Sequence, residues 1–327
     1  MIWMLMLAFA AAPEGDQACA TCHQQEHSHY SKTPMSRALV PVASCEILKR
    51  NPDLAAIEGA YTSRIVRDGD RSILTVTDGK EHIAVPLLWA FGRGQAGQTY
   101  VFERNGSYYE SRMSFYNAIQ KLDLTMGAQG TKPANLEEAS GRRMESTDAR
   151  DCFGCHSQGA VANPTPGVGC TSCHKGADKH MVEIKSGNAA AAKIPRLANM
   201  PAEDMSELCG SCHRTWSHIA ANGPRGINNV RFQPYRLTNS KCYDATDPRI
   251  SCTACHDPHG PVDTVASHYD AKCTACHAAT NAGAKVCRVA KQDCSSCHMP
   301  KLELPGAHAK FTDHQIRVYR AGAPYPN

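Results

Sequence analysis

Long hydrophobic runs are missing from this 327-residue chain. Its most apolar stretch, MIWMLMLAFAAA at positions 1–12, is too short to span a bilayer, and no other stretch is long enough. The sequence therefore predicts no membrane span. A phosphate-binding loop is missing too, because the glycine-rich segment FGRGQAG at 91–97 is not followed by the Gly-Lys-Ser/Thr that such a loop requires.

Cysteine and histidine, in contrast, are abundant, with 17 Cys and 16 His. Fourteen of the cysteines fall into seven Cys-x-x-Cys-His motifs, which is the attachment signature of c-type haem. Two thiols bond to the two vinyl groups of one porphyrin, and the adjacent His becomes the proximal iron ligand. We number the motifs 1 to 7 in chain order. Their cysteines are Cys19 and Cys22, Cys152 and Cys155, Cys170 and Cys173, Cys209 and Cys212, Cys252 and Cys255, Cys273 and Cys276, and Cys294 and Cys297; their histidines are His23, His156, His174, His213, His256, His277 and His298.

Other chemistries that use paired cysteines fit this pattern less well. Zinc sites use Cys-x-x-Cys pairs but do not require a His directly after each second Cys. A thioredoxin-like redox motif is usually single and lies in a βαβ unit, and disulfides alone would not explain the histidines. The sequence therefore predicts seven covalently attached c-type haems as cofactors.

Haem also changes the meaning of the net charge. The 35 Lys and Arg exceed the 31 Asp and Glu, which gives a formal charge of +4. Each ferric haem adds about −1, so seven haems would bring the protein to roughly −3. The basic side chains are then expected to pair with propionates or to face solvent, and no nucleic-acid partner is predicted.

The location follows from this chemistry and from the first residues. Haem is attached covalently outside the cytoplasm, and a chain this rich in Cys is best suited to an oxidising compartment or to ligation. Positions 1–12 end in small residues and resemble a signal peptide, although they lack the usual Lys or Arg. A buried N-terminal helix is the alternative. We expect a periplasmic or extracellular protein secreted through this N-terminal signal.

The motifs are spread unevenly along the chain. Motif 1 lies near the N-terminus, and the other six crowd together from Cys152 onward, one per roughly 25 residues. Such a stretch cannot build an ordinary side-chain core, so porphyrins are expected to supply most of its buried apolar surface. The expected units are a signal peptide (1–12), an N-terminal monohaem segment (13–59), a β-rich insertion (60–113), a helical connector (114–151) and a hexahaem domain (152–327).

Residues 61–113 carry a different pattern, with β-rich runs separated by turn dipeptides. Asn105-Gly106 between TYVFER and SYYESRM is the strongest hairpin signal in the chain. Beyond this region, 114–128 and 135–150 are expected to be helices, the second capped by Asn135 with Glu138. The predicted fold is mainly α with long loops, organised around packed c-type haems, with a small antiparallel β subdomain inserted near residues 60–113.

Nine histidines lie outside the motifs, and most of them lie close to one in sequence. Imidazole is the natural sixth ligand of a low-spin electron-transfer haem. His27 and His82 also belong to this group, and His82 is the weakest candidate. The candidate distal ligands are His29, His180, His218, His259, His268, His308, His314 and, as explained below, Met35.

Three short segments carry a resemblance to a known protein family. CHDPHG at 255–260, CHMPK at 297–301 and FTDH at 311–314 resemble segments of bacterial multihaem cytochromes related to the tetrahaem cytochrome and hydroxylamine oxidoreductase superfamily. The resemblance covers about two thirds of the chain. It implies closely packed haem pairs, mostly bis-His ligation and electron transfer, and some members of this family are enzymes acting on nitrogen or sulfur oxyanions.

One position departs from the pattern of these relatives. Many of them carry a His twelve residues after the first proximal His, and here Met35 stands in that place. A thioether ligand would raise the potential of that haem relative to bis-His neighbours. The alternative is that Met35 packs on a porphyrin while His27 or His29 binds the iron.

Two functions remain open at this stage. An electron carrier is favoured, because candidate ligands suffice to fill the sixth position of every haem. The alternative is a multihaem oxidoreductase for nitrite, hydroxylamine or a sulfur oxyanion, which needs one open iron position and nearby proton donors. The expected partners are redox proteins that donate and accept electrons, and oligomerisation is left open. Cys242 and Cys287 are favoured as a disulfide, with Cys45 left over.

Overall fold

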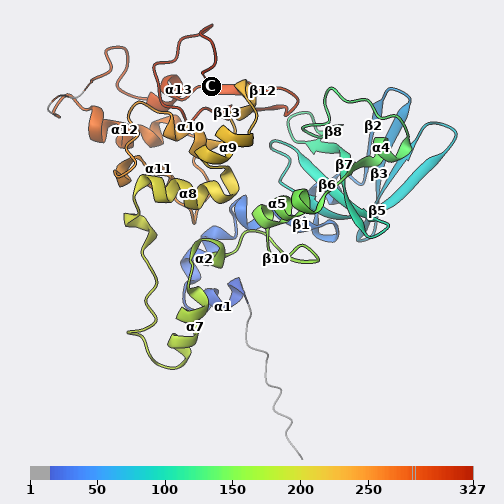
Figure 1. Cartoon of the computed structure of the whole chain (residues 1–327), viewed down its shortest axis with the longest axis horizontal. Helices are drawn as coiled ribbons and strands as arrows, with labels where there is room; N and C mark the ends of the chain where they lie inside the picture. The colour runs from blue at the N-terminus through green and yellow to red at the C-terminus, as the bar shows by residue number, and fades with distance from the viewer. Residues whose placement is uncertain (1–14, 282, 284, 327) are drawn as a thin grey trace, which may run out of the picture.

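The computed structural model describes residues 15–281, 283 and 285–326, and the expected signal peptide lies outside them. Seven consecutive strands form a nearly closed antiparallel barrel, in which neighbours in sequence are neighbours in space and β2 contacts β8. Figure 1 shows the barrel as one body beside the helical part of the chain. The barrel strands are β2 (Asp53–Glu58), β3 (Tyr61–Asp68), β4 (Arg71–Thr77), β5 (His82–Phe91), β6 (Gln98–Arg104), β7 (Ser107–Tyr116) and β8 (Lys121–Leu124).

Alternation of inward and outward side chains explains why these segments are strands. In β4, Ser72, Leu74 and Val76 are buried while the residues between them are partly exposed, as expected for a strand with one face on a core. The turn between β6 and β7 is Asn105-Gly106, with φ of +50° and +71°. Two positive φ values are what a two-residue hairpin turn requires, so this predicted hairpin is confirmed.

The predicted fold class is wrong. Helices make up 35% of the chain and strands 24%, so the fold is mixed α/β with a dominant barrel and is not mainly α. The β unit is also larger than expected, running from Asp53 to Leu124. The six closely spaced motifs suggested a helical fold. The prediction did not foresee that β2 and β8, which lie outside residues 60–113, pair with the other strands and contact each other to close the barrel.

The expected helix at 114–128 shows the reason for this error. Its first residues complete β7, and residues 121–124 form β8, which pairs antiparallel with β7. Leu122 is buried in the barrel core and lies two positions from the partly buried Leu124. Strand pairing and the burial of Leu122 outweigh the local helical tendency. The expected helix at 135–150 is also broken: Asn135 does cap a helix, accepting from the Glu138 N–H at 2.9 Å, but that helix ends at Ser140.

Two short strands attach the barrel to the rest of the chain. β1 (Leu39–Pro41) pairs with β5, and β9 (Gly141–Arg143) pairs with β7. The remaining strands form two hairpins, β10 (Ser157–Ala160) with β11 (Asn163–Pro166) and β12 (Lys301–Leu304) with β13 (Ala309–Thr312). The segment that enters the barrel lies next to motif 2, since the Ala38 carbonyl is 3.0 Å from Nδ1 of His156, and the segment that leaves the barrel continues to motif 2 along the chain.

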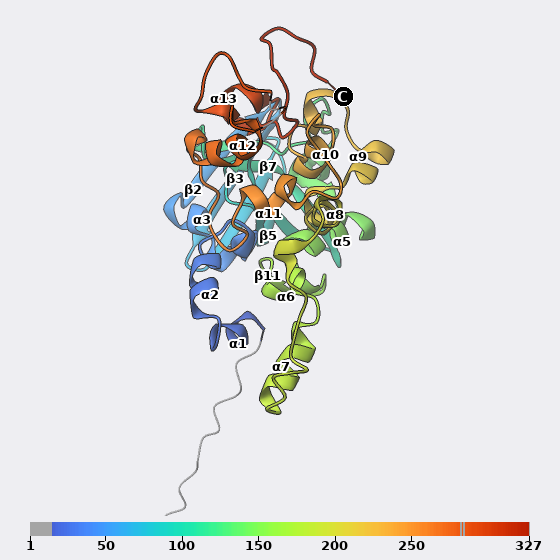
Figure 2. The same cartoon turned by 90° about the vertical axis from the view of Figure 1, so that its left-hand side faces the viewer.

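Short helices and loops make up the part of the chain that holds the motifs. Figure 2 shows this part turned towards the viewer, with the helices one above another. The α-helices are α1 (Asp16–Ala20), α2 (Gln24–Tyr30), α3 (Glu46–Arg50), α4 (Leu136–Ser140), α5 (Ser146–His156), α6 (Cys170–Cys173), α7 (Ala177–Lys185), α8 (Ala202–His213), α9 (Trp216–Asn222), α10 (Gln233–Thr238), α11 (Cys252–Cys255), α12 (Asp270–His277) and α13 (Cys294–His298). Single 3-10 turns are η1 (Met35–Arg37), η2 (Val42–Ser44), η3 (Leu197–Asn199), η4 (Gly226–Asn229), η5 (Pro248–Ile250) and η6 (Ala266–Tyr269).

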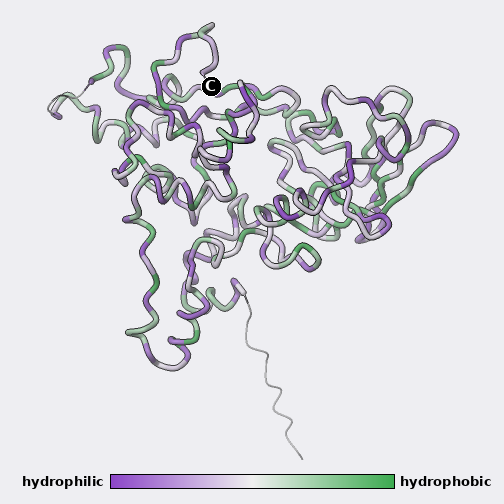
Figure 3. The backbone as a smooth tube through the Cα atoms, viewed as in Figure 1, coloured by the Kyte–Doolittle hydropathy of each residue, from purple (hydrophilic) through white to green (hydrophobic). Residues whose placement is uncertain are grey.

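Hydrophobic and hydrophilic residues are interspersed along the whole fold (Figure 3). None of the helices in the described ranges combines the length and the hydropathy needed to cross a membrane. Most buried apolar side chains belong to the barrel and to the adjoining cluster around Phe153. In the part of the chain that follows α5, the described core cluster consists of Val230, Leu304 and Ala307.

The barrel core predicts a stability difference between two positions. Phe102 is fully buried and its ring stacks on Tyr109 with 5.3 Å between ring centroids, whereas Ile57 is 77% exposed. Phe102→Ala should lower the free energy of unfolding by about 3–5 kcal/mol because it leaves a cavity. Ile57→Ala should change it by less than about 0.5 kcal/mol. Denaturant titration followed by far-UV circular dichroism measures both, and equal effects would contradict the assigned core.

Candidate functional site

The seven Cys-x-x-Cys-His motifs are carried by six short helices and one helix end. Motif 1 begins in α1, and motifs 2 to 7 lie on α5, α6, α8, α11, α12 and α13. A single helical turn places the two thiols of each motif on neighbouring positions and the His just beyond them. All motif cysteines are free thiols, so none is engaged in a disulfide that would prevent attachment of a cofactor.

Tertiary structure orders the motifs differently from the sequence. α1 packs against α6, which joins motifs 1 and 3. Cys173 of motif 3 lies near Cys209 and Cys212 of motif 4. α8 in turn packs against both α5 and α11, so motif 4 contacts motifs 2 and 5.

The series continues to the C-terminal motifs. Cys255 of motif 5 lies near Cys273 of motif 6, and α12 packs against α13, which carries motif 7. In Figure 2 the helices α1, α6, α8, α11, α12 and α13 follow one another from one end of this part to the other. The motifs therefore form a continuous row in the order 1, 3, 4, 5, 6, 7, and motif 2 branches off at motif 4 towards the barrel.

Two of these neighbouring pairs share a helix-capping carboxylate, which was not predicted from the sequence. Asp16, three residues before Cys19, accepts a hydrogen bond from the backbone N–H of Cys170 at 2.9 Å. Asp270, three residues before Cys273, accepts from the N–H of Cys294 at 2.9 Å and from that of Asp293 at 2.7 Å. In each pair a carboxylate from one motif caps the helix that carries the next. The repeated Asp-x-x-Cys spacing was visible in the sequence, but its partner was not.

Three motif histidines are held by the same kind of hydrogen bond. The Nδ1 atom lies within hydrogen-bond distance of a backbone carbonyl oxygen in His156 (3.0 Å, Ala38), His277 (3.0 Å, Lys285) and His298 (2.9 Å, Arg317). A carbonyl oxygen can only accept, so Nδ1 must carry the proton. The lone pair of Nε2 is then free, which is the arrangement that orients a metal-binding imidazole.

Histidines outside the motifs repeat this arrangement. His180 and His314 donate from Nδ1 to the carbonyls of Ala192 at 2.5 Å and Thr312 at 3.0 Å. His268 faces the Asp263 carboxylate through Nδ1 at 3.2 Å, and η6, which contains it, packs against α13. His268 is thus the candidate ligand that lies beside motif 7.

Three motif histidines face a histidine from outside the motifs. The ring centroids are 6.3 Å apart for His23 and His180, 5.8 Å for His174 and His259, and 6.2 Å for His256 and His314. Two imidazoles on opposite sides of one iron have centres about 6 Å apart, because each nitrogen lies about 2 Å from the metal and about 1 Å from its ring centre. All three pairs fit this spacing, although their members are distant in sequence.

Burial favours the neutral form of several of the site's imidazoles. It lowers the pKa of His156 and His256 below the usual value and lowers that of His314 to about 4. The His174 pKa is lowered by burial and, to a smaller extent, by the neighbouring His259 and His23. Neutral imidazole is the form that binds a metal ion, so the electrostatics of the site favour ligation.

His308 differs from the other candidates. Its Nε2 atom lies 2.7 Å from Oδ2 of Asp123 in β8, and its ring contacts Tyr116 edge-on at 4.8 Å. Because the nitrogen needed for iron is occupied, the structure places His308 as a bridge between the β12–β13 turn and the barrel. His82 lies on β5, opposite Thr77 of β4, and His29 and His218 are exposed on α2 and α9.

Met35 lies in η1, between the barrel and motif 3. Its backbone carbonyl accepts from the N–H of Val168, two residues before Cys170, and Ala38 in the same segment binds His156. The imidazole next to His23 is that of His180. The geometry therefore favours His180 over Met35 opposite the first proximal His.

The packing around the motifs fits a large apolar cofactor. Trp216 is 50% exposed, Val262 and Val265 are each 59% exposed, and Val182 is 65% exposed. These side chains belong to the helices and loops that carry the candidate ligands, where the side-chain core is small. Such apolar surface is costly to leave in water, and a porphyrin could cover it.

The three cysteines outside the motifs are also free. Cys45 is buried in the barrel core with its Sγ 3.0 Å from Oε1 of Gln98. Cys242 and Cys287 are both exposed and unbonded, so the expected disulfide between them is not present.

Comparisons with protein-family models, with curated proteins and with solved structures find nothing similar to this chain. The candidate site therefore rests on its own residues and geometry.

The capping carboxylate between motifs 6 and 7 gives a direct test of their packing. Hydrogen bonds from Cys294 and Asp293 hold the pKa of Asp270 below its usual range, so the cap is present at neutral pH and is lost as pH falls through that lowered value. Asp270→Asn should speed hydrogen exchange of the amides at 293 and 294 several-fold at neutral pH. Asp78→Asn is the matched control, since Asp78 caps two N–H groups in a barrel turn. Unchanged exchange at 293 and 294 would contradict this role.

Proposed function

We propose that this protein is a seven-haem c-type cytochrome that transfers electrons. The observation that carries the proposal is the pairing of motif and non-motif imidazoles, His23 with His180, His174 with His259 and His256 with His314, at the spacing of two ligands on one iron. Seven Cys-x-x-Cys-His motifs supply the matching attachment sites.

The residues have distinct parts in this proposal. The cysteine pairs would hold the porphyrins, and the seven motif histidines would each supply one ligand to an iron. His180, His259 and His314 would supply the second ligand at haems 1, 3 and 5, and His268 would do so at haem 7 because its segment packs on α13. When bound, haem supplies one-electron chemistry at its iron.

Filling both axial positions suits electron transfer. A six-coordinate iron offers no site to a substrate and changes little in structure when it gains or loses an electron. The contiguous row of motifs 1, 3, 4, 5, 6 and 7 supports a path along the long dimension of this part, with motif 2 as a branch beside the barrel (Figure 2). The resemblance to the tetrahaem cytochrome and hydroxylamine oxidoreductase superfamily, based on segments such as FTDH at 311–314, supports the same function.

The setting of this activity is part of the proposal. Covalent haem attachment belongs to the periplasm or the cell exterior. The partners are then redox proteins that deliver and remove electrons. A basic partner protein would be electrostatically complementary to a surface that carries carboxylates and haem propionates.

Substitution of the proposed distal ligands tests the function. His180→Ala, His259→Ala and His314→Ala should each convert one haem from low-spin to high-spin and let the reduced protein bind one carbon monoxide per chain. The reason is that each change opens one sixth position on iron. Electron paramagnetic resonance of the oxidised protein and carbon monoxide titration of the reduced protein measure this.

Two variants serve as controls for this experiment. His308→Ala and His82→Ala should leave every haem signal as in the wild type, because the first binds Asp123 and the second lies in the barrel. A wild-type protein whose mass shows no attached haem would overturn the proposal. A wild-type high-spin signal that nitrite or hydroxylamine perturbs would favour the oxidoreductase instead.

A further inference from the structure

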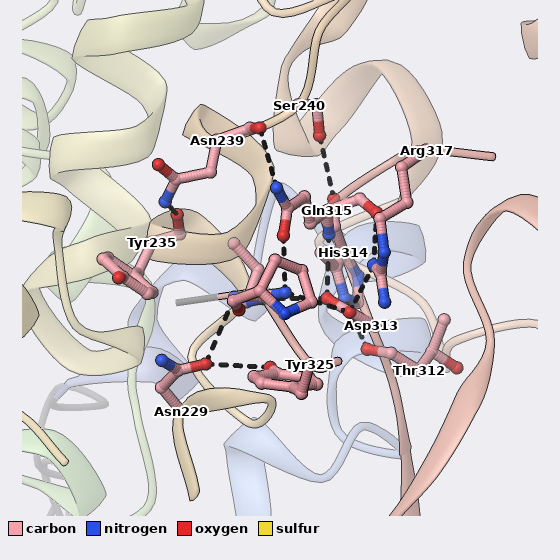
Figure 4. Close-up of polar contacts among 12 residues, drawn as sticks. Asn229, Tyr235, Asn239, Ser240, Thr312, Asp313, His314, Gln315, Arg317 and Tyr325 are labelled. Atoms are coloured by element: carbon pink, nitrogen blue, oxygen red, sulfur yellow. Dashed lines mark hydrogen bonds and ion pairs between the residues drawn. The ribbon is translucent and has the colours of Figure 1, made fainter. Parts of the chain in front are cut away.

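A buried ion pair lies directly beside His314. Arg236 of α10 and Asp313, the residue after β13, both have fully buried side chains. The guanidinium binds the carboxylate through two hydrogen bonds, Nε to Oδ1 at 2.9 Å and NH2 to Oδ2 at 3.0 Å. Figure 4 shows Asp313, His314, Gln315 and Arg317 gathered in this network.

Every donor of the Arg236 side chain is used. Besides Asp313, NH2 donates to Oε1 of Gln315 at 2.6 Å, and NH1 donates to Oδ1 of Asn229 at 3.3 Å and to the carbonyl of Pro326 at 2.8 Å. The guanidinium carbon also lies 4.5 Å from the ring centroid of Tyr325. A guanidinium has five N–H groups, and here all five are used. Three bind Asp313 and Gln315, the neighbours of His314, and two bind Asn229 and Pro326.

A second arginine joins the same carboxylate. NH1 of Arg317 lies 2.5 Å from Oδ2 of Asp313. The backbone carbonyl of Arg317 accepts from Nδ1 of His298, and the carbonyl of Thr312 accepts from Nδ1 of His314. Residues 312–317 thus hold imidazoles assigned to two different haems, and Asp313 within that segment binds both arginines.

The cost of burying these charges indicates a specific role. An ion pair taken fully out of water is weak evidence for stability, because desolvation offsets most of the attraction. What such a pair does provide is a fixed geometry, since its hydrogen bonds are satisfied in one arrangement. Ser240, two residues after the end of α10, holds the segment at two more points. Its hydroxyl accepts from the N–H of Ile316 at 2.8 Å and donates to the carbonyl of His314 at 3.2 Å.

We propose that Arg236, through Asp313 and with Ser240, is the positioning residue that sets His314 as the sixth ligand of haem 5. The inference rests on the proposed function, because it assigns a task towards that haem. Arg236 does not touch the iron. It acts by docking residues 313–316 onto α10, so that the His314 ring meets His256 at the 6.2 Å spacing.

The test replaces Arg236 in the haem-loaded protein. Arg236→Met removes the fork while Asp313 keeps Arg317 as a partner, so no carboxylate is left buried without a counter-charge. A fraction of haem 5 should become high-spin, and the reduced protein should bind up to one carbon monoxide per chain. Combining it with Ser240→Ala should enlarge the high-spin fraction, because the segment then also loses its two hydrogen bonds with Ser240, although the Gln315 side chain keeps its bond to the Asn239 carbonyl.

Conservative and distant variants separate positioning from general destabilisation. Arg236→Lys keeps the charge without the fork and should give a smaller high-spin fraction than Arg236→Met. Arg112→Met is the matched control: Arg112 binds Glu58 through Nε at 2.5 Å and NH2 at 2.6 Å within the barrel and is 9% exposed. It should disturb the barrel and leave the haem spin states as in the wild type.

The outcomes distinguish the two proposals. If Arg236→Met with Ser240→Ala leaves the haem spin states as in the wild type while His314→Ala opens one sixth position, the positioning role is wrong and the function stands. If His314→Ala also opens none, the ligand assignment itself fails. Adding Arg236→Met to His314→Ala should not raise carbon monoxide binding above one per chain, and a second equivalent would contradict action through His314.

Discussion

The hydrogen bond from an imidazole Nδ1 to a backbone carbonyl is the interaction on which the rest of the site depends. It fixes the tautomer, the orientation of the ring and the free lone pair at Nε2 in one step. His156, His277 and His298 depend on it among the motif histidines, and His180 and His314 among the others. For His156 and His298 the carbonyls belong to segments elsewhere in the chain, Ala38 and Arg317, so the chain must fold before these two rings are oriented.

This dependence explains how two unlike parts share one chain. The barrel has an ordinary apolar core and is stabilised by side chains such as Phe102 and Leu74. The part with the motifs has little apolar core of its own and exposes apolar side chains around them. The barrel contacts this part through Ala38 at motif 2 and through His308 on Asp123. We infer that the barrel supplies a rigid support, while haem would complete the packing of the other part.

Polar interactions replace that missing core at the joints between motifs. Asp16 and Asp270 cap a helix of the neighbouring motif, and the Arg236–Asp313–Arg317 group ties the C-terminal segment to α10. These contacts are directional and therefore suited to fixing separations between cofactors. The order of motifs that results follows the sequence from motif 3 to motif 7, but motif 1 lies next to motif 3, and motif 2 branches off at motif 4.

The sequence alone carries the proposed chemistry of this protein, whereas it did not predict the barrel. The Cys-x-x-Cys-His spacing predicts the proposed cofactor, its number and its proximal ligands, because attachment depends on residues that are adjacent in the chain. The hairpin at Asn105-Gly106 was predictable for the same reason. Local sequence did not reveal that residues 121–124 complete a barrel, nor that His180 lies opposite His23 while His308 binds a carboxylate. Those outcomes depend on strand pairing and on contacts between residues far apart in the chain, which only the tertiary structure decides.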